Sequence, residues 1–552
     1  MSRYAALILF VLFLRTGFAQ APFQFEIPGY DADRFRITTF ATGLNYPVGM
    51  VEFEDGSIGV LTSNGSSFFG SSSGSILKLT DTDGDGVSDQ NETLTDQVPG
   101  GKMSSLRRAG DLLFATGQGT SMSIFEIGDA EVSQIAELDM RYSGSWLHPH
   151  SALAAQQDGE NYSLYFQLGS DRNFDTTTRT VTLDADFGLT AELAGDALHR
   201  LDFAYSNQDG FSNASVTQIA SGLRNAAGMA FHPLTGNLYL EDNGIDGVQN
   251  PNEPTSADEI NVIPLGTDTI VDFGFPHNYV EYRTGNLIGN PDLAPLIAFL
   301  PLPNPADGAE AEGPNDISFG PANFPLPLHT GLFVGMHGKF SLGGTANEEN
   351  PLVFVDFRDN SYSHVIANTE PDVGHLDGIL ATDNAMYLAD ISPSGGFSAG
   401  ANRSGVIYRI ESLYPSIDAI SNAIQQGSTD SHFDLDKNGQ IDQADRTMLI
   451  RQIHDTYLGD ANMDGKFNSS DLVQVFQAEL YETDAVANWA QGDWNGDQRF
   501  GSADLVAAFQ DGSHMDATIQ TVPEPAGGLV WIVVAMVTMF HWRLPRRRLV
   551  RA

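Results

Sequence analysis

The sequence predicts a mainly β protein: a six-bladed β-propeller, then a small α-helical domain with calcium loops, then a C-terminal transmembrane helix. Three observations support this fold class. An apolar phrase recurs six times between about residues 48 and 390. Acidic twelve-residue loops alternate with helical patterns between about 413 and 515. An apolar run covers 526–542, about the shortest length that spans a bilayer.

Each copy of the phrase holds an alternating strand, a turn with Gly or Asp/Asn, and a second strand. Two short strands at this interval form the inner half of a propeller blade. The copies read VGMVEFEDGSIGVLTS, SLRRAGDLLFATG, SALAAQQDGENYSLYFQLG, AGMAFHPLTGNLYLED, DISFGPANFPLPLHTGLFVGMHG and DGILATDNAMYLAD. We expect the last strand, GVIYRIESL, to pair with the N-terminal strand FRITTFATGL. Propellers gather their functional loops at one end of the axis, so the loops between copies are the expected location of a site.

Composition narrows the function. The chain has 552 residues, enough for two or three domains. It has no cysteine, which excludes disulfides, thiol catalysis and thiolate metal sites. Its formal charge of −43 argues against a nucleic-acid surface and favours an exported protein that binds cations.

Four regions follow from these patterns. Residues 1–21 predict a secretory signal peptide, 30–412 the propeller, 413–515 the calcium repeats and 516–552 a sorting tail. The tail runs from Val-Pro-Glu-Pro through the apolar helix to an Arg cluster that should stay cytoplasmic. This order resembles the PEP-CTERM sorting signal, which implies an exosortase-type processing enzyme and a cell-envelope or extracellular location. A simple C-terminal anchor is the alternative.

Three loops in the C-terminal region have calcium-ligand spacing, in which oxygens at positions 1, 3, 5, 9 and 12 surround one ion and Gly at position 6 allows a sharp turn. The third loop departs, with Gln498 at position 6 and Gly501 at position 9. The predicted ligands are Asp434, Asp436, Asn438, Asp442 and Asp445; Asp460, Asn462, Asp464, Asn468 and Asp471; and Asp493, Asn495, Asp497 and Asp504.

The form GDANMDGKFNSSDLVQVFQ, followed by GDWNGDQRFGSADLVAAFQ, resembles the type I dockerin repeat. That resemblance implies a module that binds a cohesin-like partner. The alternative is that calcium only folds a small domain that lacks a large core.

A fourth loop, DTDGDGVSDQNE, lies inside the predicted propeller and follows the strand GSILKLT. It has the full ligand spacing, and we expect it to hold a structural calcium ion rather than a catalytic one. The predicted ligands are Asp81, Asp83, Asp85, Asp89 and Glu92.

The stretch SGLRNAAGMAFHPLTGNLYLEDNG, with the SADEINVIPLG and DFGFPHNY that follow it, resembles the soluble glucose/sorbosone dehydrogenase family. The likeness extends over about 380 residues, from FATGLNYPVGMVEF to GVIYRI. It implies a six-bladed propeller that oxidises sugars with pyrroloquinoline quinone (PQQ) and calcium.

The resemblance assigns site residues. His148 in HPHSALAAQQDG matches the general base, with His150 as the neighbouring alternative; imidazole suits this role because its pKa lies near working pH. Arg224 and Asn225 match the pair that contacts the quinone oxygens. The remaining implied contacts are Asn243 and Gly244 at the cofactor calcium, Asp258 and Glu259 as calcium-linked carboxylates, and Lys339 and His375 as cofactor-binding groups.

Two functions stay open at this point. The first is an exported quinone- and calcium-dependent dehydrogenase acting on a sugar-like small molecule. The second is a non-enzymatic, calcium-stabilised propeller that binds glycan or protein at the cell surface. The charges at the mouth of the axis should distinguish them: basic side chains beyond His148 and Arg224 favour the enzyme, because the quinone is anionic, and acidic ones favour the binding module.

Overall fold

The structure is a computed structural model, and it describes residues 22–118, 121–128, 131–249, 253–266, 269–301, 313–338, 351–366, 373–398 and 402–511. Contacts divide the chain into two compact units, Met1–Asp455 and Thr456–Ala552. The predicted signal peptide and sorting tail lie outside the described residues. Among the residues that are described, no helix has the length and apolarity needed to cross a membrane.

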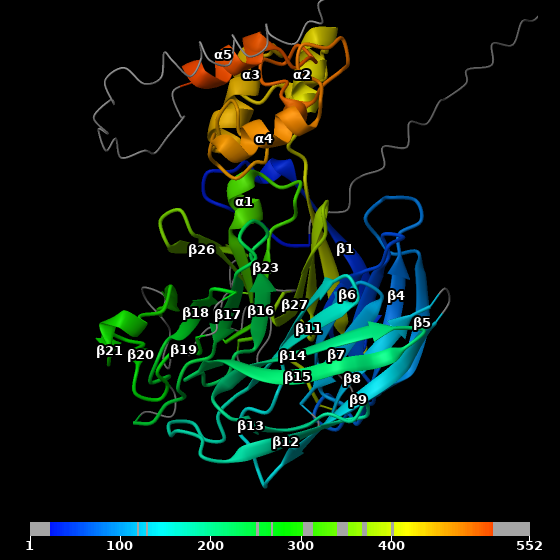
Figure 1. The fold of residues 1–552 in the computed structure, drawn as a ribbon, viewed down its shortest axis with the longest axis vertical. Coiled ribbons are helices and arrows are strands. Elements are labelled where there is room, and N and C mark those ends of the chain that lie inside the picture. Colours follow the sequence, from blue (N-terminus) through cyan, green and yellow to red (C-terminus); the bar gives the residue numbers. More distant parts are fainter. Residues whose placement is uncertain are drawn as a thin grey trace, which may run out of the picture. The chain divides into compact units, whose positions relative to one another are not determined.

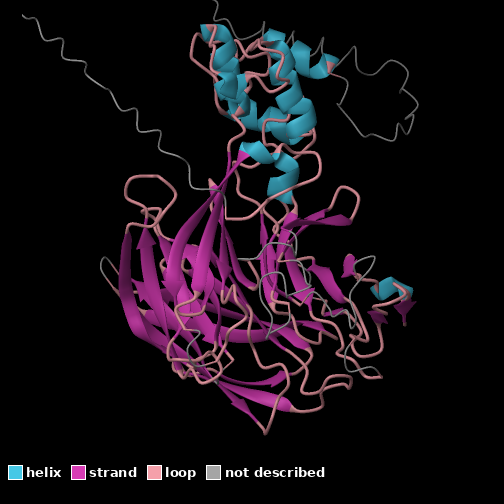
Figure 2. Ribbon diagram, turned by 180° about the vertical axis from the view of Figure 1, so that it is seen from behind, coloured by secondary structure: helices cyan, strands magenta, loops and turns pink. Residues whose placement is uncertain are grey.

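The first unit contains a six-bladed β-propeller, which confirms the predicted architecture (Figure 1). Each blade is built on antiparallel strands, to which one short parallel strand is added in the third blade, and strands account for most of the regular structure (Figure 2). The innermost strands of successive blades contact one another in order, and the last returns to the first, so the ring closes. These innermost strands are β2 (Pro47–Glu52), β6 (Met103–Ala109), β10 (Leu153–Asp158), β16 (Gly228–Phe231), β23 (Pro314–Phe319) and β27 (Leu376–Ala381).

The six repeated phrases are the inner hairpins of the six blades, as predicted. The second strands are β3 (Ile58–Ser63), β7 (Leu112–Gly117), β11 (Asn161–Leu168), β17 (Leu238–Asp242), β24 (Leu332–Met336) and β28 (Ala385–Asp390). β3, β7 and β28 are buried at every residue. Their two faces both meet neighbouring blades, so they carry continuous apolar runs instead of an alternation of apolar and polar residues.

The outer strands complete the blades. They are β4 (Ser73–Thr80), β5 (Gln90–Pro99), β8 (Ser121–Ile127), β9 (Val132–Tyr142), β14 (Ala197–Ser206), β15 (Gly210–Ser221), β18 (Asp258–Ile263), β22 (Ile297–Phe299), β25 (Leu352–Asp356) and β26 (Ser361–Ile366). Shorter strands are β19 (Val271–Asp272), parallel to β15, and the pair β20 (Tyr279–Val280) and β21 (Leu287–Ile288). The sixth blade is closed by β29 (Gly405–Ser412) and by β1 (Phe35–Leu44), which pair from Phe35 opposite Ser412 to Leu44 opposite Gly405. This confirms the predicted pairing of the chain's first and last propeller strands.

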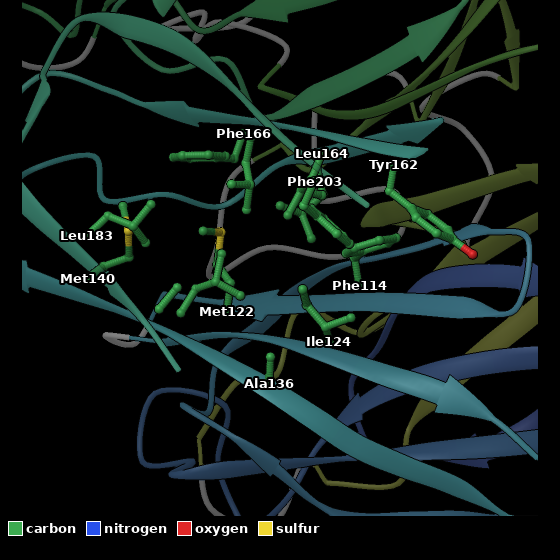
Figure 3. Packing of buried hydrophobic residues seen from close by; sticks show 14 of the residues in the cluster. Phe114, Met122, Ile124, Ala136, Met140, Tyr162, Leu164, Phe166, Leu183 and Phe203 are labelled. Atoms are coloured by element: carbon green, nitrogen blue, oxygen red, sulfur yellow. The ribbon is translucent and has the colours of Figure 1, made fainter. Parts of the chain in front are cut away.

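One hairpin crosses from the third blade to the second. β12 (Thr180–Ala185) and β13 (Thr190–Ala194) arise between β11 and β14, yet β12 pairs with β9. The large apolar cluster between these blades explains the arrangement. Figure 3 shows Phe114 of the second blade near Phe203 of the third, and Leu183 of the crossing hairpin beside Met140 of β9.

Glycines let the innermost strands approach one another at the axis. A Cβ at Gly49 would lie 2.1 Å from the main-chain nitrogen of Leu106, and one at Gly378 would lie 2.2 Å from the carbonyl oxygen of Val48. Any side chain at these positions would therefore force two neighbouring blades apart.

Helices occupy the rest of the described chain. In the first unit these are α1 (Leu326–Thr330), α2 (Ile417–Gln426) and α3 (Gln443–Met448), with a π-helical turn at Leu449–Ile453 and short 3-10 turns at Ala32–Arg34, Pro291–Leu293 and Ser431–Phe433. The first C-terminal calcium loop thus belongs to the unit that holds the propeller, and Lys437 in that loop forms a 2.8 Å ion pair with Asp31. The second unit contains α4 (Ser469–Gln477), a 3-10 turn at Trp489–Gln491 and α5 (Ser502–Gln510).

Candidate functional site

A cavity of about 520 Å³ opens at the end of the propeller axis where the loops between blades meet. Its wall includes the predicted residues His148, Arg224, Asn225, Asn243, Gly244 and Asp258. It also includes His337 and Asp377, which the sequence did not single out. Residues spread over more than 200 positions of the chain therefore converge on one cavity.

His148 lies in the loop that leads into β10. Its N–H donates to the carbonyl of Ser170 at 3.0 Å, and Gly169 lies directly beneath it. A Cβ at Gly169 would lie 2.8 Å from the Cβ of His148 and 2.5 Å from the carbonyl of Arg224, so glycine lets the two residues pack together. The Nε2 atom is buried and has no hydrogen-bond partner within the described chain. Burial, with a further contribution from the Arg224 charge, lowers the pKa of His148 to about 3, so its imidazole is neutral at neutral pH.

His150, the alternative base, is fully buried and is not part of the cavity wall. Its Nδ1 lies 2.6 Å from the Tyr142 hydroxyl, and the two rings are stacked. The geometry therefore favours His148 over His150 as the imidazole that can meet a ligand.

Arg224 and Asn225 follow β15 and are held by their main chain. Their N–H groups donate to the two carboxylate oxygens of Asp242, at 3.0 and 2.6 Å. The Arg224 guanidinium donates to Asn173 Oδ1 at 2.8 Å, to Asp246 Oδ2 at 2.7 Å and to the carbonyl of Asn243 at 3.3 Å. The cation is thus rigidly placed at the cavity, but most of its donors are already engaged by protein acceptors.

Asn243 links the fourth and fifth blades. It accepts from Asn225 Nδ2 at 2.6 Å and donates to the carbonyl of Pro314 at 2.8 Å. Gly244, the next residue, packs against the strand edge, since a Cβ there would lie 2.4 Å from the carbonyl of Ser256. These contacts fix the loop that the resemblance assigns to the cofactor calcium.

Asp258 and Glu259 occupy different environments, because successive residues of a strand point to opposite faces. Asp258 accepts from the main-chain N–H of Gly244 at 2.6 Å and of Gly313 at 3.1 Å, so both oxygens hold loops of the cavity. Glu259 is not part of the cavity wall; it accepts from the N–H of Val280, and burial raises its pKa to about 8. The structure therefore does not bring this pair together as two ligands of one ion.

Of the two predicted cations of the last blades, only His375 falls within the described residues, and it does not line the cavity. His375 is fully buried behind the wall, where its Nδ1 contacts the carbonyl of His337. Lys339 lies outside the described residues. Asp377, two positions after His375 and the second residue of β27, lines the cavity instead. Regular alternation would put residues two positions apart on the same face, and the pairing of β27 is irregular between Leu376 and Gly378, so no sequence pattern separated Asp377 from His375.

The described part of the cavity wall is acidic. Arg224 is the one Lys or Arg among its described residues, with His148 and His337 as further basic groups. Four carboxylates lie on the same wall. Three are occupied: Asp246 by Arg224, Asp258 by two main-chain N–H groups, and Glu253 by Arg283. The fourth, Asp377, has only His337 as a partner in the described chain.

Within the described chain, groups of three carboxylates close enough to hold one metal ion occur at two loops and not at the axial cavity. One cluster is Asp81, Asp83 and Asp89; the other is Asp434, Asp436 and Asp445. In each, three carboxylate oxygens lie within 4.8 Å of one another. The structure thus brings together three of the five predicted ligands in each of these two loops.

The remaining predicted ligands of these loops make other contacts. Asp85 accepts from the N–H of Val87, and Glu92 is exposed on β5. Asn438 lies next to Asp436 and accepts from Gln440, and Asp442 caps α3 by accepting from the N–H of Ala444.

The two loops of the second unit share one hydrogen-bond pattern. At position 1, Asp460 accepts two main-chain hydrogen bonds within its loop and Asp493 accepts three. At position 12, Asp471 and Asp504 each accept from the main-chain N–H groups of positions 2 and 9 of their loops. Gln498 adopts φ +67°, the conformation that Gly465 has at the same position with φ +80°. The third loop therefore keeps the turn despite losing its glycine. The side chains at positions 3, 5 and 9 are Asn462, Asp464 and Asn468 in one loop and Asn495 and Asp497 in the other.

Comparison with known proteins gives one short sequence match and several structural likenesses. No protein-family model matches the chain. A curated protein of Borreliella burgdorferi, described as uncharacterized, is 33% identical over 130 residues, which cover 22% of this chain and 30% of that protein. The chain thus matches less than a third of that relative's length.

Solved structures with a similar arrangement are sugar-oxidising propellers. A calcium structure of a Trichoderma reesei carbohydrate-active enzyme of family AA12 is 16% identical, with a TM-score of 0.46, over 72% of this chain and 99% of that one. The holo PQQ domain of pyranose dehydrogenase from Coprinopsis cinerea is 14% identical, with a TM-score of 0.44, over 72% and 99%. The PQQ-bound aldose sugar dehydrogenase from Streptomyces coelicolor is 13% identical, with a TM-score of 0.42, over 68% and 98%. Likeness at this level does not define the chemistry of this chain.

Proposed function

We propose that the protein is a dehydrogenase that oxidises a sugar or related alcohol at the axial cavity, with PQQ and calcium as cofactors. One observation carries the proposal: the neutral His148 has a buried Nε2 without a protein partner, on a cavity wall next to the Arg224 cation. A buried acceptor without a partner costs free energy, so it is retained most readily where a ligand supplies the missing hydrogen bond.

The residues present fit the reacting part of a quinone site. His148 supplies a base, Arg224 a cation and Asn225 an amide, all on one wall. The acidic surroundings fit calcium better than they fit the quinone's own carboxylates, so calcium has to offset charge there, with main-chain and ligand oxygens as its further ligands. When bound, PQQ accepts the hydride that leaves the substrate carbon.

The chain's own groups would act on the substrate hydroxyl and on developing charge. Nε2 of His148 takes the hydroxyl proton as the C–H bond breaks and the C=O bond forms. Arg224, fixed by Asn173 and Asp246, stabilises negative charge without having to reorganise. The Asn243 side chain fixes the side chain of Asn225, and the hydrogen bonds to Asp242 fix the main chain of both Arg224 and Asn225.

Reconstitution tests the proposal. Purified full-length protein is titrated with PQQ and calcium, binding is followed by quinone absorbance, and dye reduction is measured with a panel of sugars. His148→Ala should abolish dye reduction while quinone binding and the melting temperature change little. His277→Ala, at an exposed histidine outside the cavity, is the matched control. Absence of both quinone binding and dye reduction in the wild-type protein would contradict the enzyme proposal.

A non-enzymatic binding propeller is the second candidate, and the charge of the cavity favours it. Arg224 is largely satisfied by protein acceptors, and the described wall carries four carboxylates. This candidate predicts that sugar or glycan binds in calcium-containing buffer but is never oxidised with any quinone.

We also propose export and surface sorting, on the support of the sequence patterns alone. The signal-like residues 1–21 and the PEP-CTERM-like tail support cleavage by signal peptidase and processing by an exosortase-type enzyme. The dockerin-like repeats support a cohesin-like partner or, alternatively, calcium-dependent folding of the second unit.

A further inference from the structure

The Asp377 carboxylate presents an unpaired oxygen to the axial cavity. Asp377 is the second residue of β27, lines the cavity, and its side chain is 5% exposed. Oδ1 accepts from His337 Nδ1 at 2.5 Å. Oδ2 makes no hydrogen bond to any residue in the described ranges. Because Asp377 lines the cavity, Oδ2 is available to accept a hydrogen bond from a molecule that binds there.

His337 fixes the orientation of this carboxylate. It follows β24 directly, and its N–H donates to the carbonyl of Gly313 at 2.8 Å. Its ring packs against His375 at 4.8 Å and Phe397 at 5.6 Å between centroids. The imidazole therefore cannot turn without disturbing the core, and Oδ2 stays directed away from it. A donor for Oδ2 can therefore reach it from the cavity.

A second unpaired acceptor lies across the same cavity. His148 belongs to the loop that enters the third blade, and Asp377 to the innermost strand of the sixth; in a ring of six these blades are opposite. His148 Nε2 and Asp377 Oδ2 thus approach the cavity from opposite walls, and neither accepts a hydrogen bond from a residue in the described ranges. A ligand that satisfies both must donate two hydrogen bonds from separate positions.

We infer that Asp377 is the specificity-determining residue for a polyhydroxy substrate: its Oδ2 accepts a second hydroxyl while the reacting hydroxyl donates to His148 Nε2. This rests on the proposed function and names its substrate class. Neutral sugars and polyols satisfy both acceptors, whereas a monohydric alcohol satisfies one. A uronic acid that turned its carboxylate toward Asp377 would place two acceptors against each other. Sites built to hydrogen-bond a substrate hydroxyl discriminate strongly against analogues that lack it.

Asp377→Asn is the sharpest variant, because asparagine has the same shape and its Oδ1 can still accept from His337. The substitution replaces the acceptor Oδ2 with an amide donor. D-glucose and D-glucuronate are the probes, and binding to the full-length protein is measured by saturation-transfer NMR without added quinone. We expect Asp377→Asn to weaken glucose binding at least tenfold and to improve glucuronate binding relative to glucose. Asp383→Asn, which lines a separate cavity at the hairpin end of the axis, should leave both unchanged.

Kinetics separate this inference from the proposed function. With quinone and calcium present, Asp377→Asn should raise the KM for glucose at least tenfold and change kcat less than threefold, whereas His148→Ala removes kcat. An unchanged Kd, KM and glucose-to-glucuronate ratio in Asp377→Asn would overturn the role of Asp377 even if the enzyme is active. Loss of glucose binding in Asp377→Asn, in a protein that never oxidises glucose, would support the subsite and overturn the dehydrogenase. No binding of either sugar to the wild-type protein would overturn both.

Discussion

Two buried aspartates fix the loops that contain Arg224 and His375 through main-chain hydrogen bonds. Asp242 accepts the N–H groups of Arg224 and Asn225, and Asp390, the matching last residue of β28, accepts those of Gly374 and His375. Burial raises the pKa of Asp242 to about 6 and that of Asp390 well above its usual range. The same residue at the same place in two blades thus fixes two cavity loops through main-chain bonds, which leaves the side chains of those loops available for other roles.

The lowered pKa of His148 sets the expected pH dependence of oxidation. Its folded-state pKa of about 3 lies below the ordinary 6.5, so the active, unprotonated base is present at neutral pH and is lost only as pH falls toward 3. In the reconstituted enzyme we expect kcat/KM for a sugar to stay constant from pH 8 down to about 5. A single inflection near 6.5 would show that a histidine in an ordinary, solvated environment is the base.

Among the elements, the inner hairpins were predictable and the crossing hairpin was not. The two strands of each inner hairpin are adjacent in sequence and pair with each other, so the local pattern was enough to predict the six inner hairpins of the ring. The β12–β13 hairpin pairs with β9 of the second blade, where the apolar cluster between the second and third blades covers its Leu183. That choice depends on packing between distant strands, which one sequence does not display.

The loop between β4 and β5 should bind calcium through Asp81, Asp83 and Asp89. Asp81 already accepts from the N–H groups of Gly84 and Gly86 at 2.8 Å, and the carbonyl of Gly86 accepts from Thr38 Oγ1 on β1. Asp81→Asn removes one charge while keeping the loop's shape. Isothermal titration of full-length protein should then count one calcium site fewer than in the wild type, and amides of β1 should exchange faster in calcium-containing buffer.

Asp96→Asn, at an exposed residue of β5 outside the loop, is the control and should keep the wild-type number of sites. An Asp81→Asn protein with an unchanged number of sites would show that this acidic cluster is an ordinary solvated turn.

On the scale of the whole molecule, the site residues that could be predicted are those that stand in a recognisable local sequence pattern, although the site itself is assembled from several blades. His148 and Arg224 stand in stretches whose local sequence carries a recognisable pattern, and the structure places both on the cavity. Asp377 stands two positions after His375 in the same short phrase, and only the folded structure shows that Asp377 lines the cavity whereas His375 is buried behind it. Ion pairs between blades are likewise not contained in any local pattern: Arg107 of the second blade pairs with Asp316 of the fifth at 2.6 Å, and neither residue lines the axial cavity.

The second unit should respond to pH in opposite directions with and without calcium. Burial raises the pKa of Asp460 and of Asp493 to about 6, and raises those of Asp471 and Asp504, while residues 456–511 contain no histidine. Between pH 4 and 6 the calcium-free native unit therefore binds more protons than the unfolded one, and its stability falls as pH rises. The loss should be on the order of 2 kcal/mol for each of Asp460 and Asp493.

Calcium reverses this trend, because it binds the ionised carboxylates and its affinity rises as they lose their protons. Hydrogen exchange of full-length protein, corrected for intrinsic rates, should show peptides from 456–511 less protected at pH 7 than at pH 5 in chelator, and at least as protected at pH 7 when calcium is present. Equal protection in all four conditions would show that these loops fold without using calcium, and the calcium-dependent folding of this unit would then have to be abandoned.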